Sequence, residues 1–165
     1  MKIFISYLVL IAAIINSSCS KDGGINSGNF ECEVDGKSYS NKGIVTANRI
    51  LGLGFSSDIV TVSASLGIIR NISVTFSADG VVLDEPIKLY ALDNSANTIM
   101  YTDGKYQDFN HNFMEENEFI GELTITEFTN SAGAQVSGNF EGKLRSKKGE
   151  EVEIKNAVFT ASILN

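Results

Sequence analysis

The sequence VTVSASL at residues 60–66 alternates strictly between apolar and small polar side chains. The sequence NISVTF at residues 71–76 repeats the pattern, with Ile72, Val74 and Phe76 as the apolar members. Successive side chains of a β-strand point to opposite faces, so a period of two indicates a strand with one buried face. Both segments therefore predict β-strands that contribute one face each to a core.

The same period continues through most of the chain. Further alternating segments lie at residues 30–34, 87–91, 99–101, 123–125, 136–144, 152–154 and 159–163. About nine short strands with Gly, Asn and Asp between them predict an all-β domain. One apolar face per strand is typical of antiparallel sheets with a solvated outer face. We therefore expect an antiparallel β-sandwich, with a closed calycin-like barrel as the alternative.

Local signals mark where these strands begin, turn and bend. Asp35-Gly36 predicts a tight turn, and Pro86, the only proline, stands at the start of a strand. The apolar register shifts by one residue across Asn156-Ala157, which predicts a β-bulge. No segment carries a sustained helical stripe, and residues 110–120 allow at most one helical turn.

The N-terminal segment differs in character from the rest of the chain. Thirteen residues from Ile3 to Ile15 are almost wholly apolar and follow Lys2. As a helix they would span roughly 20 Å, too short for a bilayer core of about 30 Å. This pattern is typical of a secretory signal peptide. We predict a signal peptide at 1–18, a flexible Gly/Ser/Asn-rich tether at 19–29 and a single all-β domain at 30–165.

The end of the apolar run indicates a lipid anchor. Small residues, Ser17 and Ser18, stand directly before Cys19, and this arrangement resembles the lipobox of bacterial lipoproteins. The resemblance implies that Cys19 becomes the acylated, palmitate-bearing first residue of the mature chain. Two or three acyl chains anchor a protein durably, at about 0.8 kcal/mol per buried methylene. We therefore expect attachment to the membrane through the lipid on Cys19.

Ser20, Lys21 and Asp22 resemble the sorting signal that sends lipoproteins of Bacteroidota to the cell surface. The resemblance implies an outer-membrane protein, facing either the cell surface or the periplasm.

Longer stretches resemble a family of small Bacteroidota lipoproteins grouped as a domain of unknown function. The start, Phe30–Tyr39, resembles their F-x-x-x-V-D-G-K opening. Near the end, Gly121–Glu127, Val136–Phe140 and Val152–Phe159 resemble their G-x-x-T-I-T, S-G-x-F and V-x-I-x-N-x-x-F strands. The resemblance implies an architecture and a location, and it implies no function.

Charge and cysteine content limit the possible partners. The net charge is −7, and without Lys2 it becomes −8. An acidic chain with no basic cluster is unsuited to nucleic acid, so we expect no nucleic-acid partner. With Cys19 acylated, Cys32 has no disulfide partner. Cys32 shares an alternating face with Phe30 and Val34, which predicts a buried and unreactive thiol.

The sequence contains few recognisable catalytic motifs. It contains no Gly-rich phosphate loop, no nucleophile elbow and no His-Glu-x-x-His motif. His111 is the only histidine, and the carboxylates of Glu115, Glu116 and Glu118 share one polar loop. Residues 103–110 are rich in oxygen ligands, but their spacing fits a turn better than a calcium loop. We therefore expect no enzymatic activity, no cofactor and no metal.

A group of aromatic residues suggests a possible binding loop. Tyr101, Tyr106, Phe109 and Phe113 cluster between predicted strands and could contact an extracellular glycan or a protein. Alternatively, Phe109 and Phe113 cover one end of the core.

The function best supported by the sequence is a non-catalytic binding or structural module. The first alternative is a carrier of small apolar ligands, and a glycan-active enzyme is the next. A large internal cavity would favour the carrier, and two acids converging in a cleft would favour the enzyme.

Overall fold

The computed structural model describes residues 28–42, 45–50, 58–91, 96–105 and 107–164. The predicted signal peptide, Cys19 and the predicted sorting signal lie outside the described residues. The strands are β1 (Asn29–Val34), β2 (Lys37–Lys42), β3 (Val45–Ile50), β4 (Ile59–Ser65), β5 (Asn71–Ser77), β6 (Pro86–Tyr90), β7 (Thr98–Thr102), β8 (Asp108–Asn110), β9 (Phe119–Phe128), β10 (Gln135–Ser146) and β11 (Glu151–Leu164). One 3₁₀ turn, η1 (His111–Phe113), is the helical element among these residues. The all-β prediction is confirmed.

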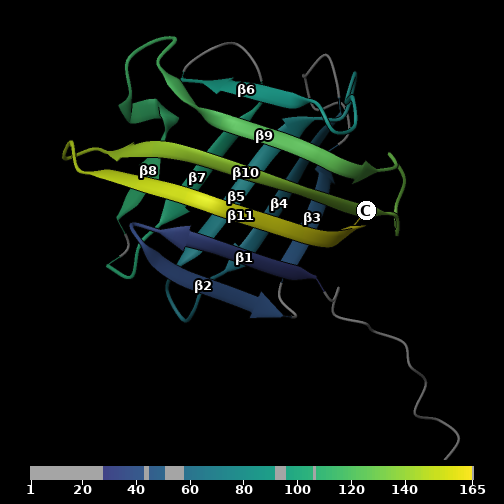
Figure 1. The fold of residues 1–165 in the computed structure, drawn as a ribbon, viewed down its shortest axis with the longest axis horizontal. Coiled ribbons are helices and arrows are strands. Elements are labelled where there is room, and N and C mark those ends of the chain that lie inside the picture. The colour runs from purple at the N-terminus through teal and green to yellow at the C-terminus, as the bar shows by residue number, and fades with distance from the viewer. Residues whose placement is uncertain (1–27, 43–44, 51–57, 92–95, 106, 165) are drawn as a thin grey trace, which may run out of the picture.

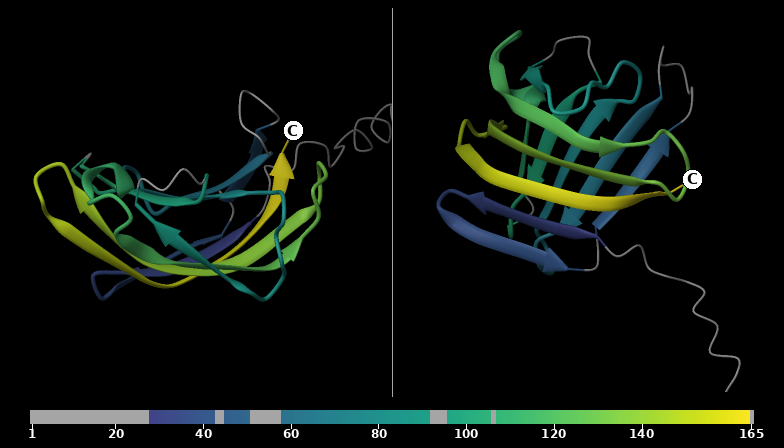
Figure 2. Two further views of the ribbon diagram at one scale, coloured as in Figure 1. Left: turned by 90° about the horizontal axis from the view of Figure 1, so that it is seen from above. Right: turned by 45° about the vertical axis from the view of Figure 1, so that its right-hand side comes forward.

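All eleven strands belong to one hydrogen-bonded sheet that folds over into two facing layers. Figure 1 shows the front layer in the order β2-β1-β11-β10-β9-β6 and the back layer in the order β3-β4-β5-β7-β8. The front layer bows around the back layer, and the strands of the two layers cross obliquely (Figure 2). The core lies between them.

Two short pairings join the layers at their corners. The end of β11 pairs with β3 through Ile163 opposite Ala47 and Leu164 opposite Asn48, and β10 pairs with β8 in a similar two-residue contact. Because these links are so short, the fold is a sandwich joined at its corners and not an evenly closed barrel. The β11–β3 pair is parallel, whereas the other pairings are antiparallel as expected.

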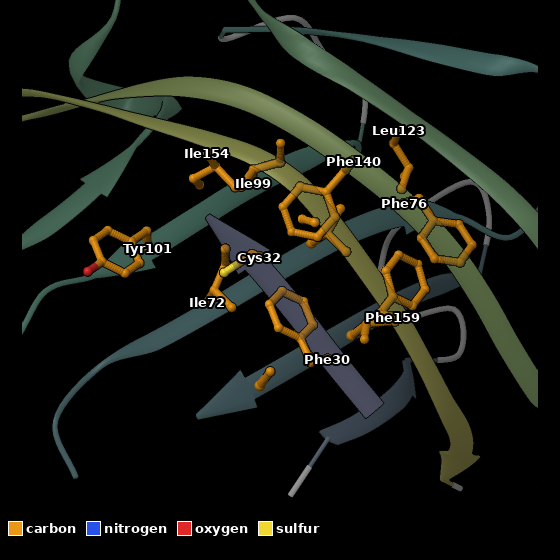
Figure 3. Packing of buried hydrophobic residues seen from close by; sticks show 14 of the residues in the cluster. Phe30, Cys32, Ile72, Phe76, Ile99, Tyr101, Leu123, Phe140, Ile154 and Phe159 are labelled. Carbon is orange, nitrogen blue, oxygen red and sulfur yellow. The ribbon is translucent and has the colours of Figure 1, made fainter. Parts of the chain in front are cut away.

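The alternating residues that open the sequence analysis form β4 and β5, which pair along their full length. Their apolar members face inward and are buried. Across the interior, the rings of Phe76 on β5 and Phe128 on β9 meet edge to face with centroids 5.7 Å apart. Within the front layer, the Phe140 ring lies 6.0 Å from Phe30 and 6.3 Å from Phe159. Figure 3 shows the rings of Phe30, Phe76, Phe140 and Phe159 between the layers.

The predicted turn and bulge are confirmed. Asp35 and Gly36 have φ values of 49° and 76°, which is the geometry of the tight turn that joins β1 to β2. In β10, Phe140 pairs with Ala157 but Gly142 pairs with Ile154, so β11 carries an extra residue at this point. Asn156 takes the left-handed φ of 50°. The bulge lets both halves of β11 keep their apolar residues inward, and so one strand replaces the two expected there.

The predicted number of strands is too low because three polar or short strands were missed. The sequence of β2, KSYSNK, contains a single large apolar residue, Tyr39, and β8 has only three residues. In β3, VTANRI, the alternation ends at Arg49. Each of these strands is held by its neighbours and by main-chain hydrogen bonds, which leave little trace in the apolar pattern.

Candidate functional site

The outer face of the front layer carries a hollow over β9, β10 and β11. It measures about 620 Å³. Its polar lining includes Glu122, Thr124, Ser137, Asn139, Glu141 and Thr160. We call this site the outer hollow.

Local structure explains why the sheet is hollowed here. The strand register places Ser137 and Thr160 at one end of the hollow, and Thr124, Asn139 and Val158 across its middle. The longer Glu122 and Glu141 stand at the other end. The ladder is also irregular beneath it, since the β9–β10 register shifts between Ser137 and Gly138. Short side chains on an irregular ladder leave a depression in the surface.

A second hollow of about 330 Å³ adjoins the first at Glu141. It is lined by Phe119, Lys143, Glu153 and Lys155, among others. We call it the adjoining hollow.

An aromatic pair stands at the edge of the adjoining hollow. Phe119 on β9 lies opposite Tyr90 on β6, and their rings meet edge to face with centroids 5.8 Å apart. Phe119 is 51% exposed. Phe119 therefore presents an apolar ring to solvent beside a polar surface.

The charged side chains of the adjoining hollow form ion pairs with one another. The Glu153 carboxylate lies 2.8 Å from Lys155 Nζ and 3.8 Å from Lys143 Nζ. The hydrogen bond from Lys155 lowers the pKa of Glu153, and the same contact raises the pKa of Lys155. Both lysines are thus directed toward Glu153.

Two acids in the outer hollow have lysines near them but no close ion pair: Lys88 on β6 lies opposite Glu122, and Lys155 attracts Glu141 electrostatically. Glu122 and Glu141 lie directly opposite each other on neighbouring strands. Neither forms a salt bridge with any described residue. Like charges placed opposite each other in a sheet are destabilising by about 0.2–1 kcal/mol. The two lysines offset part of this repulsion, and both carboxylates line the outer hollow.

Hydroxyl groups in the outer hollow are held by their neighbours. Ser137 Oγ donates a hydrogen bond to Glu127 Oε2 at 3.1 Å and lies 3.3 Å from Thr160 Oγ1. These contacts fix the orientation of two hydroxyls that line the hollow.

The back layer has a different outer face. Its outward side chains on β4, β5 and β7 are almost all hydroxyls and amides, namely Thr61, Ser63, Ser65, Asn71, Ser73, Thr75, Ser77, Thr98, Met100 and Thr102. None of these side chains is charged. Thr61 and Thr75 pair across the strands through their hydroxyls at 3.0 Å. We call this surface the neutral face.

The aromatic residues of the predicted binding loop do not form a cluster at the surface. Tyr101 on β7 and Phe109 on β8 are buried, with exposures of 5% and 6%, and their rings lie 5.9 Å apart. Phe113 in η1 is half-buried, and Tyr106 lies outside the described residues. Phe109 thus takes the alternative role, in which it covers the core.

The acidic loop residues have structural contacts or face solvent. Glu118 pairs with Arg145 at 3.2 Å and accepts a hydrogen bond from the Glu115 amide at 3.0 Å. Glu115 and Glu116 are exposed. These carboxylates do not converge on a cleft.

Other candidates for chemistry also have local partners. Asp103 Oδ1 accepts hydrogen bonds from the amides of Lys105 and Gln107, which closes the turn between β7 and β8. His111 Nδ1 lies 2.6 Å from Thr98 Oγ1. Cys32 is buried as expected, and burial raises the pKa of its thiol to about 11. Within the described ranges, no three His, Cys, Asp or Glu side chains group as metal ligands.

Sequence reasoning missed the aromatic pair on the outer face. Tyr90 stands between the buried residues Leu89 and Ala91, so the alternation of β6 already placed it outward. Phe119 was harder to find because it precedes another apolar residue, Ile120, and Gly121 breaks the regular ladder. The buried Ile120 takes the inward position and leaves Phe119 outside.

Comparison with family models, with curated proteins and with solved structures finds no match for this chain.

Proposed function

We propose that this protein is a lipid-anchored, non-catalytic binding module of the outer membrane. The acyl chains on Cys19 hold it to the membrane, and the outer hollow of the front layer binds its partner. The observation that carries the proposal is the position of the outer hollow, which lies on the outside of a sandwich whose described interior holds one cluster of buried apolar side chains.

The packing of the interior argues against a carrier of apolar ligands. Such a carrier needs an apolar cavity of several hundred Å³. Here the rings of Phe30, Phe140 and Phe159 pack one against the next, and Phe76 reaches Phe128 across the layers. The hollows of about 620 and 330 Å³ lie on the polar outer surface of the sheet.

The geometry of the acids argues against a glycosidase. Its two carboxyl groups flank the scissile bond from opposite sides of a cleft. Glu122 and Glu141 instead stand side by side on adjacent strands of one sheet face. Two carboxylates on the same side of a ligand can accept hydrogen bonds, but they cannot attack one face and protonate the other.

The anchor rests on the sequence. The lipobox-like Ser17-Ser18-Cys19 and the Lys21-Asp22 signal support acylation and delivery to the outer membrane, and the resemblance to small Bacteroidota lipoproteins supports the same location. The cell surface and the periplasmic face remain the two possible sides.

Palmitate labelling followed by membrane fractionation tests the anchor. The wild-type chain should incorporate label and sediment with outer membranes, whereas Cys19→Ala should do neither. Normal membrane retention of an unlabelled Cys19→Ala chain would contradict it. A parallel titration with a fluorescent fatty acid tests the filled core, and saturable binding by the wild-type protein would support the carrier instead.

A further inference from the structure

We propose that the ligand of the outer hollow is a neutral oligosaccharide, which stacks on Phe119 and hydrogen-bonds to Glu122, Glu141 and the hydroxyl-lined floor. This inference rests on the proposed binding function and names the ligand class for the same site.

The lining matches a polyhydroxylated ligand. Thr124 supplies a hydroxyl and Asn139 an amide that both donate and accept hydrogen bonds. Ser137 and Thr160, whose protons are engaged with Glu127 and with each other, supply further acceptors. Each sugar hydroxyl has the same dual character. An apolar ligand would leave the Thr124 hydroxyl and the Asn139 amide without water or other partners, at a cost of about 1–3 kcal/mol for each group buried unsatisfied.

The acid pair gives the hollow its strongest acceptors. Hydrogen bonds to an ionised carboxylate are shorter and roughly twice as strong as neutral ones. Because Glu122 and Glu141 have no salt bridge among the described residues, their oxygens are available to ligand hydroxyls. A ligand that donates to both carboxylates would also offset part of their mutual repulsion. The pair thus gives the hollow two carboxylates that no described lysine or arginine binds at salt-bridge distance.

The aromatic ring provides the apolar half of sugar recognition. A pyranose ring has a face of C–H groups as well as hydroxyls at its rim, and an aromatic side chain buries that face. Phe119 is half exposed, and contact with Tyr90 holds its ring. The ring lines the adjoining hollow, which meets the outer hollow at Glu141. One elongated ligand can therefore reach the ring and the polar floor together.

The dimensions fit a short oligosaccharide. Three neighbouring strands place β9 about 10 Å from β11, and the four residue steps from Ser137 to Glu141 cover about 13 Å. A volume of about 620 Å³ falls within the usual range of small-molecule sites.

Other ligand classes fit less well. The two neighbouring glutamates of the outer hollow repel phosphates and other anions, so nucleic acids and acidic glycans are disfavoured. An extended peptide would normally add to a free sheet edge or fill apolar pockets. The outer hollow instead lies over the inner strands β9, β10 and β11, which are paired on both sides. A basic protein is the remaining competitor, because it would complement the acid pair.

The test is a titration of the mature lipoprotein, purified in detergent, with cellohexaose, xylohexaose, mannohexaose and maltohexaose, and separately with poly-L-lysine. At least one hexasaccharide should bind, and its affinity should not change with salt because the ligand is neutral. Phe119→Ala should weaken binding about tenfold. Asn139→Trp, which fills the hollow, should abolish it.

Matched controls separate binding from folding. Met100→Ala removes an exposed apolar side chain of the neutral face, 42% exposed, and should leave the affinity unchanged. If Asn139→Trp lowers the thermal midpoint, Glu141→Gln provides the second test, since it keeps the shape and removes the charge. It should weaken binding several-fold.

The ligand class is overturned if none of the hexasaccharides binds at millimolar concentration, if only poly-L-lysine binds, or if the outer-face variants bind as the wild type does. The proposed function is contradicted by different results, namely membrane retention without palmitate labelling or saturable uptake of a fatty acid. Its failure can therefore be distinguished from failure of the ligand class.

Discussion

The outer faces of the two layers cover equally apolar inner faces, yet they differ in chemistry. The neutral face of the back layer carries threonine, serine and asparagine, with Met100 as its one exposed apolar side chain. The outer face of the front layer carries glutamates, lysines and an exposed aromatic ring. The back layer is solvated almost entirely by hydroxyls and amides, so solvation does not require two opposed glutamates or an aromatic ring that is 51% exposed on the front layer. We therefore infer that the inner faces of both layers stabilise the fold and that the outer face of the front layer binds the ligand.

The largest effect should come from the shared interior. Phe76→Ala in the back layer and Phe159→Ala in the front layer should each lower the free energy of unfolding by about 3–5 kcal/mol, because both side chains are fully buried. Chemical denaturation with a far-ultraviolet signal measures the change. If one variant were neutral, the two layers would not share a single core.

Gly138 tests how tightly the front layer is built beneath the outer hollow. A Cβ atom at this position would lie 2.5 Å from the Thr124 carbonyl oxygen and 2.8 Å from the Phe159 ring. Gly138→Ala should therefore lower stability by roughly 1–3 kcal/mol, since a backbone atom cannot move aside cheaply. Gly133→Ala, in the β9–β10 loop with no atom within 4 Å, makes a control whose cost comes only from its φ of 77°. Equal stability of Gly138→Ala and wild type would contradict the packing.

Glu141→Gln should separate stability from binding. Removing one charge of the opposed pair relieves a repulsion of about 0.2–1 kcal/mol and loses part of the attraction to Lys155, so the free energy of unfolding should change by less than about 1 kcal/mol. The same change should weaken ligand binding. Thr61→Val on the neutral face removes a hydroxyl pair and should leave binding unchanged. A larger loss of stability in Glu141→Gln would mean that the acid pair supports the fold.

Cys32 should give the smallest effect at neutral pH. Burial raises the pKa of its thiol from 9.0 to about 11, so the native state favours the neutral form. Its contribution to stability is complete below pH 9 and is lost as the pH rises toward 11. Near pH 8 the thiol should react with a maleimide only after unfolding, measured by mass spectrometry with the mature chain acylated at Cys19. Rapid reaction of the native protein would show that the front layer opens at β1.

The comparison of the two faces also shows what sequence could predict. Period-two alternation was sufficient for β4 and β5 because their inner positions are apolar and their outer positions are small and polar. The bulge at Asn156 was predictable because the apolar register shifts there. In contrast, β2 and β8 are defined by pairing with neighbours, which the local pattern does not encode.

The site was less predictable than the fold. Tyr101 and Phe109 are aromatic residues near a loop, but each occupies an inward strand position and belongs to the core. The outer hollow depends on the register of β9 against β10, which brings Glu122 opposite Glu141. These two residues are 19 positions apart in the sequence, and no local pattern joins them.

Mapping of amide chemical shifts by nuclear magnetic resonance, during titration with the best-binding hexasaccharide, tests the central claim most directly. We predict that the perturbed amides lie on β9 and β10 around Thr124 and Ser137–Glu141, and extend to Phe119. Perturbations confined to the neutral face, around Ser63 and Ser73, would contradict it and would assign binding to the back layer.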